Sequence, residues 1–103
     1  MPPESSDRSI LSVSLHGPIT LYESVEVREI LRAALAERKD LRVDLDASGP
    51  WDLAGLQLLV SLVNSCEKAG RSVRLVNVPG VCREIAERSG LGDWLAGSTD
   101  SFG

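Results

Sequence analysis

The sequence predicts an α/β domain in which a mixed β-sheet of four to five strands is covered by helices. The spacing of apolar residues switches repeatedly between two, which is typical of strands, and about 3.6, which is typical of helices. The elements expected from this pattern follow the order β-β-α-β-α-β-α, and helices that alternate with strands favour a sheet with helices packed on it. The chain has 103 residues, of which 43% are hydrophobic, and this suffices for one domain with its own core.

The first half of the chain is expected to hold three strands and one helix. Residues 10–15 alternate between apolar and polar side chains, as a half-buried strand does. Thr20 and Glu23 have the spacing of a capping box, in which each side chain bonds to the backbone of the other residue, so a helix should begin near Leu21. The other elements expected here are a short strand around Ile19, a strand over residues 41–45 and a loop over residues 47–50.

The second half is expected to hold two helices, one strand and a final helical turn. Asp52 is a favourable amino-terminal cap, so the second helix should begin there and run to Ala69, before Gly70 ends it. Pro79 suits the first turn of a third helix, because an N–H group at that position would have no helical partner. The remaining expectations are a strand over residues 72–76, an end of the third helix at Arg88 and one more helical turn over residues 91–95.

One folded domain is expected over residues 9–96, without an internal repeat or a linker. Residues 1–8 contain proline and serine and are expected to form a flexible leader, and residues 97–103, with glycine and serine, a flexible tail. The start of the chain has neither the basic nor the apolar segment of an export signal. The sequence therefore predicts a cytoplasmic protein.

The composition argues against binding to nucleic acids or membranes. The 15 acidic and 11 basic residues give a net charge of −4, and the basic residues are interleaved with acidic ones. Binding of nucleic acid or of an anionic membrane requires clustered lysine and arginine. No apolar run approaches the ~18 residues of a membrane helix, so membrane insertion is not expected. Cys66 and Cys82 are expected to be core residues in a reducing compartment.

No pattern of residues demands catalysis. His16 is the single histidine, and the sequence contains neither a G-x-S-x-G motif nor a phosphate-binding G-x-x-x-x-G-K-[ST] motif. One histidine and two separated cysteines cannot supply the converging ligands that a metal site needs. The sequence therefore predicts a protein that is not an enzyme and that has no cofactor and no metal.

The helix that begins at Asp52 is the most informative element. Apolar residues occupy more than half of its circumference, which leaves a narrow polar strip that contains Gln57 and Ser61. Cover by the sheet and by a neighbouring helix accounts for most of the apolar surface. This cover does not account for Leu53, which stands at the start of the helix beside the polar strip. An exposed leucine there would form an apolar surface suited to binding another molecule.

Segments in several parts of the chain carry a family resemblance. Residues 19–27, ITLYESVEV, lead from a strand into a helix. Residues 43–45, VDL, form a central strand, and residues 52–59, DLAGLQLL, begin a helix in the manner of an Asp-Ser/Thr-Ser/Ala-Gly motif. Residues 75–77 and 83–91 are similar to the late strand and the closing helix of the same family. In their order and spacing, these segments together resemble the STAS domain. The resemblance spans residues 9–95 and points to the family of bacterial anti-sigma factor antagonists and related regulatory modules.

The resemblance implies a docking surface that has lost its switch. In the STAS family, the residue after the aspartate is commonly a serine or threonine whose phosphorylation releases a bound partner. Here that position is Leu53, and Ala54 follows it, so neither position carries a hydroxyl group. A permanent apolar group replaces a phosphate of about −1.5 to −2 charges. The partner-binding residues that the resemblance implies are Asp52, Leu53, Ala54, Gly55, Gln57 and Ser61.

Each residue at the helix start has an expected role and an alternative. Asp52 should cap the helix and fix the preceding loop, Gly55 should permit close backbone approach, and Leu53 should be an apolar anchor. Alternatively, Leu53 packs against Trp51 or the preceding loop as part of the core. Ser48, four residues before Asp52, is the nearest candidate for a displaced phosphorylation site, and ordinary turn chemistry also explains it.

The main functional prediction is a regulatory protein-binding module that resembles an anti-sigma factor antagonist and stays in its unphosphorylated-like state. Its partner would be an anti-sigma factor or a serine kinase-like ATPase, in a partner-switching system that regulates transcription. The alternatives are an accessory subunit of a lipid-transport ABC system, bound to the ATPase subunit of that transporter, and a chemotaxis-associated scaffold. A third alternative is a nucleotide or lipid ligand in a crevice of the domain. The expected state is a monomer or a weak homodimer.

Overall fold

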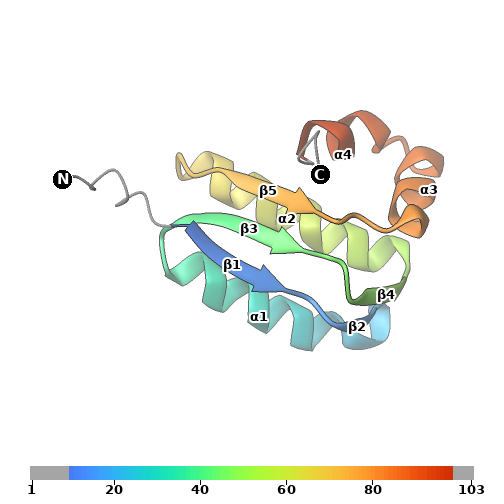
Figure 1. Ribbon diagram of the computed structural model, residues 1–103, viewed down its shortest axis with the longest axis horizontal. Helices are drawn as coiled ribbons and strands as arrows, with labels where there is room; N and C mark the ends of the chain where they lie inside the picture. The colour runs from blue at the N-terminus through green and yellow to red at the C-terminus, as the bar shows by residue number, and fades with distance from the viewer. Residues whose placement is uncertain (1–9, 99–103) are drawn as a thin grey trace.

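Five strands and four α-helices alternate along residues 10–98, the part of the chain that the computed structural model describes (Figure 1). The α/β class expected from the sequence is confirmed. The strands are β1 (Ile10–Ser14), β2 (Gly17–Ile19), β3 (Asp40–Asp44), β4 (Ser48–Trp51) and β5 (Val73–Val76). The helices are the short 3-10 helix η2 (Leu21–Glu23) and the α-helices α1 (Ser24–Ala36), α2 (Leu53–Lys68), α3 (Gly80–Arg88) and α4 (Gly92–Ser98).

The strands form two small parallel sheets. One sheet has the order β1-β3-β5, and β2 pairs with β4 in the other. Because β2 follows β1 and β4 follows β3 along the chain, the second sheet continues two strands of the first after a bend (Figure 1). Backbone hydrogen bonds from Leu15 N to Asp44 O (3.1 Å) and from Gly17 N to Ala47 O (3.0 Å) join the two segments across the bend.

The sheet differs in one respect from the expected mixed sheet. The number of strands agrees with the prediction, but the pairings among residues 10–98 are all parallel and are divided between two sheets. The cause lies in the connections, because α1 carries the chain from β2 back to the start of β3, and α2 carries it from β4 back to the start of β5. A crossover helix of this kind joins parallel strands.

The segment predicted as a loop, residues 47–50, instead forms most of β4. Serine, glycine and proline are typical of turns, and for this reason the prediction was wrong. The segment pairs with β2, with Ile19 opposite Trp51. Gly49 has a φ of +131°, which side-chain-bearing residues rarely adopt, so this irregular strand depends on a glycine. Pairing with a distant segment, rather than local propensity, makes the segment a strand.

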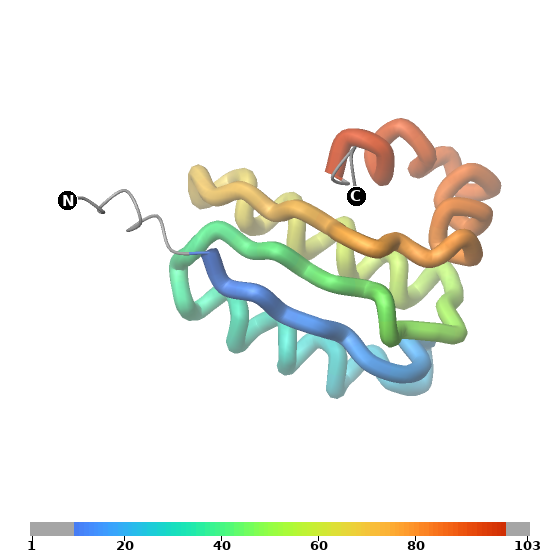
Figure 2. The backbone as a smooth tube through the Cα atoms, viewed as in Figure 1, coloured from blue at the N-terminus to red at the C-terminus, as the bar shows by residue number. Residues whose placement is uncertain are grey.

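α1 and α2 lie side by side and cover one face of the three-stranded sheet (Figure 1). Both helices begin at the end of the molecule where β2 and β4 lie, and both run back along the sheet (Figure 2). The core between the helices and the sheet is apolar. Its fully buried residues include Leu15, Leu41, Val43, Leu45, Leu56, Leu59 and Leu75.

Both cysteines belong to this core, as the sequence predicted. Cys66 of α2 and Cys82 of α3 have no exposed surface, and neither forms a disulfide. Burial raises the pKa of the Cys82 thiol to about 12, and it raises the pKa of the Cys66 thiol as well. Both thiols therefore stay protonated at neutral pH and are poor nucleophiles.

The predicted helix ends are confirmed for α2 and α3. Asp52 and Ala69 cap the two ends of α2, and Pro79 caps the start of α3. α4 is longer than the single turn predicted, and it runs through Ser98, two residues into the segment expected as a tail. The rest of that segment, residues 99–103, and the expected leader, residues 1–8, lie outside the described residues.

Candidate docking surface at the start of α2

Asp52 holds together the starts of two helices. Its Oδ1 accepts a hydrogen bond of 3.0 Å from Gly55 N, which caps α2 as the sequence predicted. Its Oδ2 accepts a second bond of 3.0 Å from Leu21 N at the start of η2. This second bond was not predicted, because the two residues are 31 positions apart and no local pattern links them. One carboxylate therefore fixes the position of η2 relative to α2.

Gly55 lets the first turn of α2 approach the backbone of β2. A Cβ atom at Gly55 would overlap the carbonyl oxygen of Ile19 and would lie 2.9 Å from the Ile19 Cγ2 atom. The sequence predicted that this glycine permits a close backbone approach, and the approach is to the chain's own strand. Gly55 itself is buried, so it does not contribute to the exposed surface but allows the first turn of α2 to pack against β2.

Leu53 is an exposed apolar side chain at the start of α2. It leaves 41% of its surface accessible, so it is not part of the core. The alternative prediction, that Leu53 is buried as part of the core, is therefore wrong. Trp51, against which Leu53 could have packed, is itself buried beneath the surface with 6% exposure. The structure thus presents an apolar group beside the Asp52 cap.

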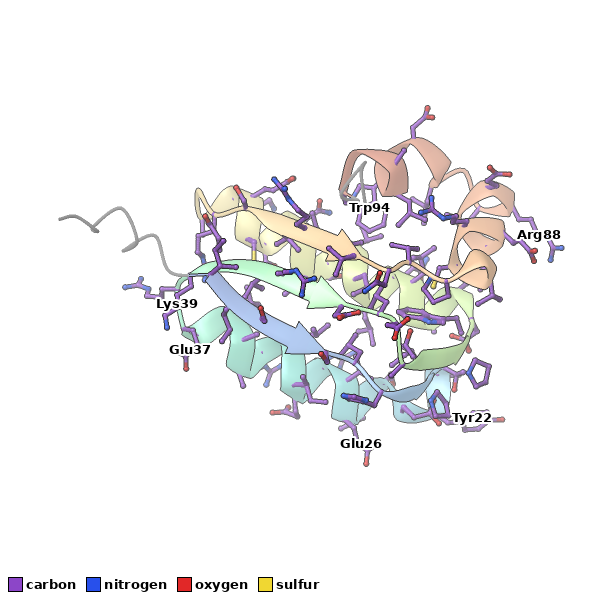
Figure 3. The ribbon with its side chains drawn as sticks, viewed as in Figure 1. Tyr22, Glu26, Glu37, Lys39, Arg88 and Trp94 are labelled. Atoms are coloured by element: carbon purple, nitrogen blue, oxygen red, sulfur yellow. The ribbon has the colours of Figure 1, made fainter. Side chains whose placement is uncertain are left out.

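Further exposed apolar side chains lie at the start of the neighbouring helix. Leu21 is 64% exposed, Tyr22 is 92% exposed and Val25 is 68% exposed. The bond from Leu21 N to Asp52 places this segment next to the start of α2. Figure 3 shows Tyr22 projecting outward at this end of the molecule, with Glu26 projecting from the first turn of α1. We call Leu21, Tyr22, Val25 and Leu53 the apolar end.

A second cap orders the segment that carries these residues. The capping box predicted from Thr20 and Glu23 is confirmed, because Thr20 N donates a bond of 2.9 Å to Glu23 Oε1 and Tyr22 N donates one of 3.3 Å to Thr20 Oγ1. The box opens the 3-10 turn η2 at Leu21, and α1 begins three residues later at Ser24. The hydrogen bonds from the Thr20 side chain and backbone hold the pKa of the Glu23 carboxyl below its ordinary value of 4.5.

Comparison with known proteins agrees with this architecture. The family model described as "Mlab, STAS domain" matches residues 4–97. The chain belongs to the STAS domain family. No curated protein matches the chain. The fold of this STAS domain is similar to that of a sulfate transporter family protein from Wolinella succinogenes, with a TM-score of 0.69, 20% identity and coverage of 87% of this chain and 75% of the other.

A second similar structure is the anti-sigma factor antagonist SpoIIAA in its unphosphorylated form. The TM-score is 0.61 at 15% identity, and the similarity covers 78% of this STAS domain and 74% of SpoIIAA. At such low identities, the two structures establish the shared fold. The STAS domain described here therefore shares its fold with SpoIIAA and with the sulfate transporter family protein from Wolinella succinogenes.

The structure brings only part of the predicted site to one surface of this STAS domain. Leu53 and Gln57 are exposed, Asp52 and Ala54 are half-buried, and Gly55 is buried. Ser61 is exposed two turns further along α2, where it lines a groove between α1 and α2. The residues that the sequence analysis missed are Leu21, Tyr22 and Val25. Their signal was present, since Leu21 and Tyr22 directly follow Thr20 and Val25 comes two residues after Glu23.

Ser48 has a structural role in β4. Its hydroxyl donates a bond of 2.7 Å to Leu45 O and accepts a bond of 2.8 Å from Trp51 Nε1. The hydroxyl is therefore the polar partner of a buried indole. Phosphorylation at Ser48 would break both bonds. A phosphorylation switch at this residue is therefore hard to reconcile with an intact β4.

We expect Ser48→Ala to lower the free energy of unfolding by about 1–2 kcal/mol, because the Trp51 N–H would be left buried without a partner. Urea denaturation followed by far-ultraviolet circular dichroism measures this loss. Ser61→Ala, at an exposed serine of α2, is the matched control and should change the stability by less than about 0.5 kcal/mol. Equal stability of Ser48→Ala and the unmodified chain would show that the Ser48 hydroxyl has no structural role.

The described residues offer no site for metal binding and no helix that could span a membrane. Within residues 10–98, no group of three or more histidine, cysteine, aspartate or glutamate side chains is placed to hold a metal ion. No helix in the same range is both long enough and apolar enough to cross a bilayer.

Proposed function

We propose that this STAS domain is a non-enzymatic regulatory module that binds a protein partner through the start of α2. The observation that carries the proposal is the exposure of Leu53 at the position that follows the capping aspartate. Burial of a leucine side chain contributes roughly 1.5–3 kcal/mol, and an apolar group in the middle of an interface can dominate binding. The surrounding apolar end enlarges this surface.

The rigidity of the surface supports a docking role. Asp52 ties η2 to α2, and Gly55 seats the first turn of α2 directly on β2. A surface that is ordered before binding loses little conformational entropy when a partner docks. Because Leu53 cannot accept a phosphate, we propose that the domain stays permanently in the unphosphorylated-like, binding-competent state. Phosphorylation at Ser48 remains a prediction, and its structural bonds argue against it.

The partner we propose is an anti-sigma factor or a serine kinase-like ATPase, in a cytoplasmic partner-switching system that regulates transcription. The fold similarity to SpoIIAA supports this partner class. The similarity to a sulfate transporter family protein favours the second candidate, an accessory subunit of a transporter. In that case we propose that the partner is the ATPase subunit of the transporter. A scaffold in a chemotaxis system is the remaining alternative. In each case the domain needs no cofactor and acts as a monomer or a weak homodimer.

The test replaces the exposed leucine. We expect Leu53→Asp to weaken binding to the anti-sigma factor, kinase-like ATPase or transporter ATPase encoded beside its gene by about 30-fold or more, since an apolar contact of about 2 kcal/mol becomes a buried charge. Isothermal titration calorimetry with the purified partner measures the change. Circular dichroism checks that the variant is folded.

Val81→Asp is the matched control for this substitution. Val81 lies on α3 and is 39% exposed, nearly the same fraction as Leu53, but it lies outside the proposed surface. The control variant should bind the partner with unchanged affinity. If Leu53→Asp is folded and also binds with unchanged affinity, the start of α2 is not the docking surface.

A further inference from the structure

A groove runs between α1 and α2, next to the proposed docking surface. Its volume is about 240 Å³. The floor is apolar, because it consists of leucine side chains that are buried or half-buried, namely Leu31 and Leu35 of α1 and Leu58 and Leu62 of α2. The two helices run in the same direction (Figure 2). The lining residues recur every three or four positions along both helices, so the groove is parallel to both helix axes.

The two rims of the groove differ in charge. Arg28 and Arg32 stand one turn apart on the α1 rim, and Ser61 and Ser65 stand one turn apart on the α2 rim. None of the side chains that line the groove is acidic. The groove is therefore a local basic site on a chain whose net charge is −4. An occupant that carries carboxylates beside an apolar stripe would match it.

The existing ion pair at the rim does not close the site. Arg32 Nη1 lies 3.4 Å from Glu29 Oε2, and both side chains are largely exposed, at 67% and 63%. Exposed pairs of this kind contribute at most about 1 kcal/mol, so a carboxylate of a docked partner can displace Glu29. A docked carboxylate can instead bridge Arg32 and Arg28.

The groove continues the proposed docking surface. Leu53, Gln57 and Ser61 follow one another at intervals of four residues, so they lie along one stripe of α2 that leads from the apolar end to the groove rim. On α1, Val25 stands one turn before Arg28 and leads to the other rim in the same way. A single extended element could contact both the apolar end and the groove.

The geometry points to an amphipathic helix of the protein partner, with carboxylates beside its apolar stripe, as the occupant of this groove. This inference rests on the proposed function, since it takes the partner to be a protein. A volume of about 240 Å³ is below the roughly 300–1,000 Å³ of a pocket that encloses a small molecule, so it fits a few inserted side chains better. A helix that binds in a groove inserts residues at i, i+3 or i+4, and i+7, and its flanking positions can present glutamates to Arg28 and Arg32.

The test uses two synthetic peptides of about 18 residues, or five helical turns. Both peptides carry the same leucine stripe, and the flanking positions are glutamate in one and lysine in the other. Each peptide is titrated into the isotopically labelled full chain, and amide NMR signals are followed. We expect the acidic peptide to give saturating shifts at Arg28, Arg32, Ser61 and Ser65. The lysine peptide should bind at least about ten-fold more weakly, because it places cations beside the two arginines.

Charge reversal supplies the matched variants. The double substitution Arg28→Glu and Arg32→Glu should weaken binding of the acidic peptide by about ten-fold or more. The double substitution Arg83→Glu and Arg88→Glu on α3 changes the net charge equally and should leave the binding of the peptide unchanged. Equal binding of both peptides, or no shifts at the groove residues, would overturn the inference. Decanoate, a single-chain fatty acid, is titrated in the same way. If decanoate gives saturating shifts at the groove and the acidic peptide gives none, the occupant is a lipid and the inference is overturned.

The outcomes separate this inference from the proposed function. If the acidic peptide fails to bind the groove while Leu53→Asp weakens binding of the partner as expected, only the assignment of the groove as a docking site is wrong. If the peptide binds as expected while Leu53→Asp leaves partner binding unchanged, the groove is a docking site and the start of α2 is not.

Discussion

Replacing Gly55 with alanine is expected to destabilise this STAS domain by more than about 3 kcal/mol, the upper end of the effects seen for overpacked sites. The added methyl group would overlap the carbonyl oxygen of Ile19, and it would also press on the Ile19 side chain. A backbone carbonyl cannot rotate away as the end of a flexible side chain can. The first turn of α2 would have to move off β2, and the bond from Asp52 to Leu21 would be strained with it.

Urea denaturation measures the effect of Gly55→Ala, and Gly80→Ala provides the matched control. Gly80 also lies in the first turn of an α-helix, but a Cβ atom there would meet no other atom within 4 Å. Alanine has the higher helix propensity, so Gly80→Ala should leave the stability unchanged or raise it by up to about 1 kcal/mol. A Gly55→Ala variant as stable as Gly80→Ala would mean that α2 does not contact β2 as described.

Replacing Asp52 with alanine is expected to lower the free energy of unfolding by about 2–3 kcal/mol. The variant loses the amino-terminal cap of α2, which alone contributes roughly 0.5–2 kcal/mol, and it also loses the acceptor for Leu21 N. Amide hydrogen exchange should become faster at both Gly55 and Leu21, because one carboxylate protects both N–H groups. Faster exchange at Leu21 is the result that a simple helix cap would not produce.

Asp52→Asn separates the two bonds. The two N–H groups bond to different oxygens of Asp52, and asparagine replaces one of these oxygens with an NH₂ group that cannot accept a bond. We expect its stability to lie between those of the unmodified chain and Asp52→Ala. Asp46→Ala, at an exposed aspartate before β4, serves as the control and should have little effect. Unchanged exchange at Leu21 in Asp52→Ala would contradict the bridging role.

Local signals in the sequence predicted much of the fold. The capping box at Thr20 and Glu23 and the cap at Asp52 could be predicted because each depends on residues three positions apart. The strand β4 could not, because its residues favour a turn and become a strand only by pairing with β2. The same reason explains the division into two sheets, since the bend between them depends on how distant segments meet.

The candidate site follows the same pattern. The helix periodicity placed Leu53 beside the polar strip but left open whether it is exposed or packs in the core, and the structure shows that it is exposed. The contact of Gly55 with Ile19 and the bond of Asp52 to Leu21 join segments that are far apart in the sequence, so no spacing rule reveals them. Leu21, Tyr22 and Val25 were visible as apolar residues, but their exposure depends on which face of α1 the sheet covers.

The shared direction of α1 and α2 has an electrostatic consequence. Each helix has a macrodipole equivalent to roughly half a positive charge at its amino end, and here the two positive ends lie next to one another. The carboxylates of Asp52 and Glu23 stand at these ends and offset the repulsion between them. Two acidic side chains therefore set the local potential that an approaching molecule meets at this end of the domain, in addition to their roles as helix caps.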